Sequence, residues 1–173
     1  MPALRQSSPV TIEPLDKKRH DRAAFDCGVS ALNTYLQRQA AQDMEKHAAV
    51  VYVAVIEPPA IAGYYTLSAH SIDAAELPPA MARKLPRFPL PVTLLGRMAV
   101  SQSLQGRGLG EFLLLHALER AWLGSKQVAS WAVVVDAKAG ARNFYLKHSF
   151  TRLPNFPDRM FLPITTIEKL FEG

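Results

Sequence analysis

The sequence predicts an α/β fold, in which apolar strands alternate with helices. The apolar run Leu94–Val100 leads through a polar turn and three glycines into a strongly apolar helix. Two Val-rich segments, 47–56 and 128–135, have the composition of buried strands. With 173 residues, 49% of them hydrophobic and 20% charged, the chain has the length and composition of one globular domain, which we expect to span residues 1–173.

The first half of the chain is predicted to hold a short strand, a helix and a hairpin. Pro14 is expected to end the first strand, and Ser30 has the character of a helix N-cap. Five prolines between residues 73 and 91 leave room for little more than a short helix in a long excursion. The expected elements are a strand at 10–14, a helix from 30 to about 46, strands at 47–56 and 61–68, and a short helix at 80–84.

The second half alternates strands and helices. Gly124 is expected to end the long apolar helix, which should be largely buried against a sheet. The expected elements are a strand at 94–100, a helix at 108–123, a strand at 128–135, a short helix at 141–148, strands at 150–153 and 160–163, and a last helical turn or two at 165–171.

Gly106, Gly108 and Gly110 lie between a predicted strand and a predicted helix. Glycines let backbone N–H groups crowd together, and the helix N-terminus adds its positive dipole end, so the turn predicts a seat for an anion, most naturally a phosphate. The spacing disfavours the known nucleotide motifs. A P-loop would need Lys and Ser or Thr after its last glycine, and the dinucleotide fingerprint would need glycine in place of Glu111.

Composition also bounds the environment of the protein. The longest apolar run, 48–56, is far too short to span a membrane, and the N-terminal residues hold no apolar core of signal-peptide length. Cys27, the single cysteine, excludes an internal disulfide framework, and we expect it to be a small buried residue that braces a turn rather than a nucleophile. The five histidines show no metal-binding spacing. We therefore expect a cytoplasmic protein without a metal.

Two motifs follow one another in the second half of the chain, Gln105-x-x-Gly108-x-Gly110 and Ala141-Arg-Asn-Phe-Tyr-Leu-Lys-His-Ser-Phe150. The first resembles the acetyl-CoA signature of the GNAT family of N-acetyltransferases, and the second is similar to that family's second helical segment. Ser149 departs from the family's glycine, which would take the left-handed conformation that ends a helix. The resemblance implies the GNAT fold: a central mixed, mostly antiparallel sheet of about six to seven strands, flanked by about four helices.

Five further stretches, 25–28, 32–36, 63–68, 95–100 and 160–163, carry a narrower resemblance. They are similar to segments of the GNAT toxins of bacterial toxin–antitoxin pairs. This resemblance implies acetylation of the α-amino group of aminoacyl-tRNA, which blocks translation, a ribbon-helix-helix antitoxin as partner, and a possible homodimer.

The resemblance also assigns roles at the acetyl-CoA site. Tyr145 takes the position of the general acid, because its phenol can protonate a departing thiolate. No carboxylate base is expected, since an α-amino group titrates near pH 8 and is already partly neutral. The implied cofactor contacts are Met98, Ala99 and Val100 for the pantetheine arm, Gln105, Gly106, Arg107, Gly108, Leu109 and Gly110 for the pyrophosphate, and Asn143.

The net charge of +5 is unevenly distributed, which suits a polyanionic partner but is equally typical of a solvated surface. The candidate tRNA contacts are Lys17, Lys18, Arg38, Arg83, Lys84, Arg87 and Arg97. Two alternatives stay open. One is a GNAT enzyme for a small-molecule amine or a protein N-terminus, and the other is a catalytically silent module that binds coenzyme A or an antitoxin.

Overall fold

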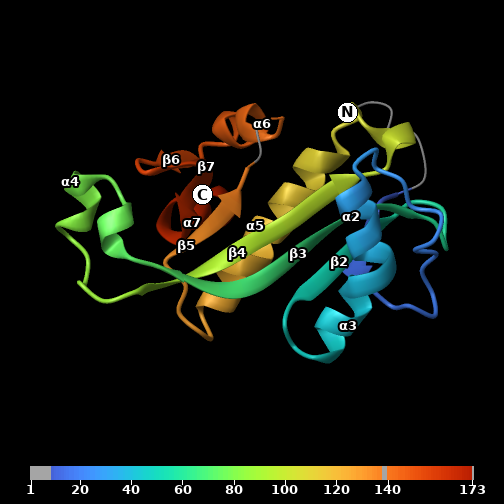
Figure 1. Cartoon of the computed structure of the whole chain (residues 1–173), viewed down its shortest axis with the longest axis horizontal. Helices are drawn as coiled ribbons and strands as arrows, with labels where there is room; N and C mark the ends of the chain where they lie inside the picture. The colour runs from blue at the N-terminus through green and yellow to red at the C-terminus, as the bar shows by residue number, and fades with distance from the viewer. Residues whose placement is uncertain (1–8, 138–139, 173) are drawn as a thin grey trace. The chain divides into compact units, whose positions relative to one another are not determined.

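The computed structural model, shown in Figure 1, describes residues 9–137 and 140–172. The strands are β1 (Thr11–Pro14), β2 (Val50–Val55), β3 (Ile61–Ile72), β4 (Leu90–Val100), β5 (Ala132–Asp136), β6 (Thr151–Leu153) and β7 (Phe156–Pro163). The helices are α2 (Ser30–Thr34), the π-helical η1 (Tyr35–Gln39), α3 (Ala40–Glu45), the 3-10 turn η2 (Ala74–Glu76), α4 (Pro79–Ala82), the 3-10 turn η3 (Gln102–Leu104), α5 (Leu109–Ser125), α6 (Arg142–Lys147) and α7 (Ile164–Glu172).

The strands form a seven-stranded sheet with the order β1-β2-β3-β4-β5-β7-β6. Of the pairs whose register the structure describes, β4–β5 is parallel, and β1–β2, β2–β3, β5–β7 and β6–β7 are antiparallel. The predicted fold class, a mixed and mostly antiparallel sheet with helices, is confirmed. The chain divides into two compact units, Met1–Ser68 with Arg97–Ala117 and Ala69–Gly96 with Leu118–Gly173.

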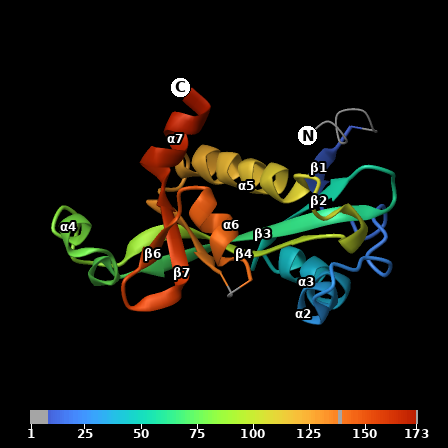
Figure 2. The ribbon, with the colours of Figure 1, turned by 90° about the horizontal axis from the view of Figure 1, so that it is seen from above.

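The first unit buries β2 and β3 between helices. Because successive side chains of a strand point to opposite faces, Tyr64 and Tyr65 of β3 meet different partners. The Tyr64 hydroxyl donates to the carbonyl oxygen of Leu32 at 2.8 Å on the side of α2. The Tyr65 hydroxyl lies 2.7 Å from Nδ1 of His116 on α5. Figure 2 shows α2 and α3 on one side of these strands and α5 on the other.

Gly63 sets how closely β3 approaches its neighbours in this unit. A Cβ at this position would lie 2.8 Å from the carbonyl oxygen of Ala99 on β4 and 2.9 Å from Cδ1 of Leu113 on α5. Both distances are too short for any side chain. The absence of a Cβ therefore lets β3 pack tightly against the last residues of β4.

The second unit has its own apolar core. Leu90 and Val92 of β4, Val134 of β5 and Phe161 of β7 are buried together. The long excursion between β3 and β4 is anchored to this core by Leu77, which is 2% exposed, and the capping box of Asp73 fixes its start. The short helix predicted at 80–84 is α4, displaced by one to two residues.

Several predicted boundaries are wrong. Val29, not Ser30, is the N-cap of α2, because Asn33 and Asp26 already bind the backbone of the preceding turn. Gly124 does not end α5, which continues to Ser125. Its φ is not positive, so it supplies no left-handed turn. The strand predicted at 128–135 begins only at Ala132, and Val128 is 78% exposed.

Two expectations about single residues are confirmed. Ser149 has a φ of 72°, the left-handed conformation that its position in the motif predicts. Cys27 is buried, and its backbone N–H donates to Oδ1 of Asn33 at 2.9 Å, so it braces the turn. The connection at 136–140 is described only in part, because residues 138–139 lie outside the described residues.

Candidate active site

In the first unit, the loop between β4 and α5 is tied down by one side chain. Nε2 of Gln105 donates to the carbonyl oxygen of Val100 at 2.9 Å and to that of Cys27 at 3.0 Å. The backbone N–H of Gln102 donates to the carbonyl oxygen of Asp26 at 2.9 Å. The Gln105 side chain therefore holds the loop in place. Of Gln105, only the main chain remains a candidate for cofactor binding.

The loop then turns onto the N-terminus of α5 in a way that only glycine permits without strain. Gly106 and Gly108 have φ angles of 80° and 84°. A Cβ at Gly106 would meet nothing within 4 Å, so the space above the turn is open. Phe112 N–H makes the first bond of the helix, to the carbonyl oxygen of Gly108, and Leu109 is buried below. The N–H groups of residues 109–111 have no acceptor within the helix, which makes this end a seat for an anion.

Arg107 is exposed next to this turn. It lines a pocket of about 330 Å³, together with Ser101, Ser103 and Leu104 of the loop and residues 56–57 and 60–62 of the β2–β3 hairpin. The backbone N–H of Ser101 donates to the carbonyl oxygen of Ala62 at 2.8 Å, which holds the end of β4 against β3. The N–H groups, the open space above the turn and the Arg107 cation form a site that can accept a phosphate group.

The last residues of β4 divide their contacts between core and solvent. Ala99 is buried in the core of the first unit, whereas Met98 and Val100 are half-buried and Arg97 is exposed. The guanidinium Cζ of Arg97 lies 3.6 Å from the centroid of the Tyr35 ring, a cation–π contact. The backbone N–H of Arg97 donates to Oγ1 of Thr66 at 3.1 Å.

Tyr35 and Asp43 were missed by the sequence reasoning. The Tyr35 hydroxyl donates to Oδ2 of Asp43 at 2.8 Å, and burial, with Asp43 adding to it, raises the pKa of Tyr35 to about 12. The pKa of Asp43 is lowered, first by the hydrogen bond from Gln39 and then by that from Tyr35. Tyr35 lies in the stretch 32–36 that resembles the toxins, but the sequence assigned it no role, and no spacing in the sequence links it to Arg97.

In the second unit, α6 carries Tyr145 and Asn143. The Tyr145 side chain is 7% exposed and packs edge-on against the rings of Phe144 and Phe150, with centroids 5.2 Å and 5.3 Å away. Burial raises the pKa of Tyr145 to about 12. The phenol therefore keeps its proton at neutral and mildly alkaline pH, as a proton donor must. Asn143 is exposed on the same helix.

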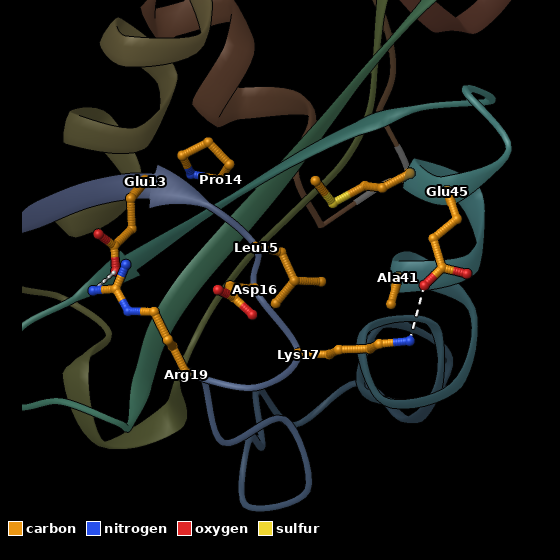
Figure 3. A pocket seen from close by; sticks show the side chains of 9 residues that line it. Glu13, Pro14, Leu15, Asp16, Lys17, Arg19, Ala41 and Glu45 are labelled. Atoms are coloured by element: carbon orange, nitrogen blue, oxygen red, sulfur yellow. Dashed lines mark hydrogen bonds and ion pairs between the residues drawn. The ribbon is translucent and has the colours of Figure 1, made fainter.

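The candidate tRNA contacts are divided between the two units. In the first unit, Lys17 is paired with Glu45 at 2.9 Å, as Figure 3 shows, in a pocket of about 580 Å³ that Glu13 and Asp16 also line. These carboxylates make Lys17 a poor contact for a polyanion. Lys18 and Arg38 of this unit are exposed. In the second unit, the exposed cations Arg83, Lys84 and Arg87 lie together on the excursion after α4.

The structure also bears on metals and membranes. Among residues 9–137 and 140–172, no three side chains of His, Cys, Asp or Glu gather in a way that could hold a metal ion. Within the same ranges, no helix is both long enough and apolar enough to cross a lipid bilayer.

Comparison with known proteins places this geometry in a family. Residues 47–152 match the acetyltransferase (GNAT) domain. A probable toxin TacT of Sinorhizobium fredii is 33% identical over 169 residues, which cover 92% of this chain and 93% of that protein. A tRNA-acetylating toxin of Mycobacterium tuberculosis is 32% identical over 143 residues, which cover 82% of this chain and 85% of that toxin.

Solved structures share the fold along nearly the whole chain. AtaT in complex with acetyl-methionyl-tRNAfMet superposes with a TM-score of 0.87 at 32% identity, covering 94% of this chain and 99% of AtaT. A Tyr-to-Phe mutant of AtaT bound to acetyl-CoA and the C-terminus of the antitoxin AtaR gives 0.81 at 28% identity, covering 95% and 99%. The KacTA–DNA complex gives 0.79 at 31% identity, covering 94% and 98%.

Proposed function

This chain belongs to the acetyltransferase (GNAT) family, and we propose that it is a toxin that acetylates the α-amino group of aminoacyl-tRNA and so blocks translation. The observation that carries the proposal is the glycine turn onto the N-terminus of α5, in a chain that matches a tRNA-acetylating toxin over 82% of its length. The turn supports the acetyl donor, and the relatives support the acceptor.

Acetyl-CoA supplies the acetyl group as a thioester. We assign the pantetheine arm to the main chain of Met98, Ala99 and Val100, which would receive it as an added strand. The pyrophosphate is assigned to the N–H groups from Gly106 to Gly110, with the Arg107 guanidinium as a charge partner. Asn143 is a further contact. Because main-chain groups do most of this binding, the backbone conformation of the loop matters more than its side chains.

Tyr145 is assigned as the general acid. Its hydroxyl would give its proton to the departing thiolate, and burial, which raises the pKa of Tyr145 to about 12, leaves the phenol protonated at neutral pH. A backbone N–H near Val100 would stabilise the oxyanion that forms when the amine attacks. No protein base is needed to prepare the amine, because an α-amino group, which titrates near pH 8, is already partly neutral at pH 7. The proton that the nitrogen loses after the attack would pass to water, and water would return a proton to the Tyr145 phenolate.

The substrate proposal includes the exposed cations. Arg83, Lys84 and Arg87 would contact tRNA phosphates from the excursion after α4, because none of these three is paired with a carboxylate among the described residues. Such contacts position a nucleic acid without reading its sequence. Lys18 and Arg38 are secondary candidates, and Lys17 is the weakest because Glu45 already neutralises it.

Partners and setting follow from the proposed activity. We propose that an antitoxin binds this chain, and the complexes of AtaT with AtaR and of KacTA with DNA support a DNA-binding antitoxin such as a ribbon-helix-helix protein. Aminoacyl-tRNA is a cytoplasmic substrate, so we place the protein in the cytoplasm.

We further propose that residues 1–173 act as one acetyltransferase domain, since β3 and β4 each run through both units. We also propose that the chain forms a homodimer, which light scattering can test.

The test is to incubate the protein with labelled acetyl-CoA and total charged tRNA, and then to identify the acetylated amino acid. We expect label on the α-amino group of one or a few aminoacyl-tRNAs, and loss of that label with Tyr145→Phe. Label in protein N-termini or in a small amine, but not in aminoacyl-tRNA, would show an ordinary GNAT enzyme instead. A Tyr145→Phe variant as toxic on expression as the wild type would show that toxicity does not depend on this acid.

A further inference from the structure

Among the candidate substrate contacts, Arg97 is nearest in sequence to Met98–Val100, the segment of β4 assigned to the pantetheine arm. Contacts of Arg97 within the first unit restrict its side chain. Its guanidinium lies 3.6 Å from the centroid of the Tyr35 ring. Its backbone N–H is bound to Oγ1 of the buried Thr66. Arg97 is thus fixed at the backbone by β3 and at its charged end by η1.

Tyr35 is itself held from two sides. Its hydroxyl donates to Oδ2 of Asp43, whose Oδ1 accepts a hydrogen bond from Nε2 of Gln39 at 2.8 Å. Its ring stacks on the ring of Tyr64, with centroids 6.3 Å apart and planes 17° apart. The Tyr35 side chain is 6% exposed. The π-helical turn Tyr35–Gln39 begins at this residue, and such turns often occur at functional sites.

This support leaves the binding atoms of Arg97 available. One face of the guanidinium is covered by Tyr35, and the charge of Arg97 acts on Asp43, whose pKa it lowers after the larger effects of the hydrogen bonds from Gln39 and Tyr35. No ion pair within 4 Å and no side-chain hydrogen bond of Arg97 is found among residues 9–137 and 140–172. The planar fork of N–H donors matches two oxygens of a phosphate. Because stacking has already restricted the long side chain, less rotamer entropy is lost when a ligand binds.

We propose that Tyr35, held by Asp43, is a positioning residue that presets Arg97 to bind a backbone phosphate of the 3′-terminal nucleotides of the acceptor tRNA. The proposal rests on the proposed function, and it deepens it by naming what recognises the end of the substrate that carries the amine. Met98, directly after Arg97, begins the strand assigned to the pantetheine arm. A phosphate bound at Arg97 would hold the 3′ end of the tRNA beside the segment that holds the donor.

The test measures binding separately from acetylation. The probe is an uncharged, fluorescently labelled RNA minihelix that ends in CCA, titrated across a salt series. With Arg97→Ala we expect weaker binding and a slope of log K against log salt that is smaller by about one unit, the signature of one lost phosphate contact. With Tyr35→Leu we expect about five-fold weaker binding, the size of an exposed to half-buried cation–π contact. Tyr35→Phe keeps the ring and should bind within about two-fold of the wild type.

A double-mutant cycle separates positioning from mere structural support. If Tyr35 acts through Arg97, adding Tyr35→Leu to Arg97→Ala should not weaken minihelix binding further. Acetyl-CoA affinity should be unchanged in every variant. Arg120→Ala, which removes an exposed cation of α5 that lies 3.7 Å from Oε1 of Glu119, is the control for the loss of one positive charge and should leave the affinity within about two-fold of the wild type.

Three results would overturn the proposal. The first is minihelix binding by Arg97→Ala as tight as that of the wild type. The second is weaker binding by Arg97→Ala with an unchanged salt slope, which would indicate base stacking. The third is a loss of affinity on Tyr35→Leu that is equally large with and without Arg97. Failure of the proposed function would look different, because labelled acetyl-CoA would then give no acetylated aminoacyl-tRNA whatever the minihelix shows.

Discussion

Gly63→Ala tests whether the close contact between β3 and β4 shapes the cofactor strand. The new methyl group would start 2.8 Å from the carbonyl oxygen of Ala99 and 2.9 Å from Cδ1 of Leu113, against ordinary contacts of 3.4 Å or more. Leu113 can change rotamer, but the carbonyl of Ala99 belongs to the main chain of β4. The strand must therefore move by several tenths of an ångström, and Met98 and Val100 move with it.

We expect the unfolding free energy of Gly63→Ala to fall by about 1–2 kcal/mol. Overpacking of a core costs about 1–3 kcal/mol, and the lower entropy of an unfolded Ala chain returns about 0.5–1 kcal/mol. With a urea m-value of about 2 kcal/mol/M, the urea midpoint should drop by about 0.5–1 M. Calorimetric titration should also show weaker binding of acetyl-CoA, because the displaced main chain is the proposed pantetheine partner.

Gly124→Ala is the matched control. A Cβ at Gly124 meets nothing within 4 Å, and the residue lies inside α5, so the same change should stabilise the protein by about 0.5–1 kcal/mol and leave acetyl-CoA binding unchanged. If Gly63→Ala unfolds at the wild-type urea concentration and binds acetyl-CoA as tightly as the wild type, the argument from the β3–β4 contact is refuted.

Four further outcomes are expected. Ser149→Gly should raise the unfolding free energy by about 0.5–1 kcal/mol in urea titrations, because a φ of 72° strains serine and not glycine. Tyr145→Phe should lower kcat about 100-fold in acetylation assays with the urea midpoint nearly unchanged, since the ring stays between Phe144 and Phe150. From pH 10 to 12 the unfolding free energy of the wild type, measured in urea, should fall, because a tyrosine in the unfolded chain releases its proton near pH 10 whereas folded Tyr145, with a pKa of about 12, keeps it. The unfolding free energy of Tyr145→Phe should fall less over the same pH range. Replacing Lys84 and Arg87 by Glu should weaken acetylation of tRNA without changing acetyl-CoA affinity; unchanged tRNA kinetics across a salt series would contradict this.

The sequence predicted those parts of the fold that depend on local pattern. The apolar run at 94–100 and the glycines after it predict β4 and the turn onto α5. A turn with positive φ angles favours glycine, so closely spaced glycines indicate such a turn from the sequence alone. Ser149 was read in the same way. The boundary errors at Ser30 and Gly124 amount to one or two residues, because the end of a helix depends on small differences among neighbouring positions that all favour a cap or a stop.

The rest of the site could not be predicted, because it depends on contacts between distant segments. The pairing of Arg97 with Tyr35 joins β4 to η1, and neither residue is unusual where it stands in the sequence. Lys17 is a weaker candidate for nucleic-acid binding because it is already paired with Glu45 of α3, which is distant from it in the sequence. Charge in a sequence counts cations, but only the fold shows which of them are already paired.

The proposed assignments give the end of β4 two independent means of recognition. Its main chain carries the N–H and C=O groups assigned to the pantetheine arm, and these do not depend on which side chains the strand bears. Its exposed side chain, Arg97, is assigned to the acceptor and is held by Tyr35 through contacts that leave the main chain of Met98 and Val100 untouched. Substitution at Arg97 or Tyr35 should therefore change the affinity for the acceptor while the proposed donor site is kept. It follows that Arg97→Ala should raise the KM for aminoacyl-tRNA and leave the KM for acetyl-CoA unchanged, whereas Gly63→Ala, which moves the main chain, should affect both.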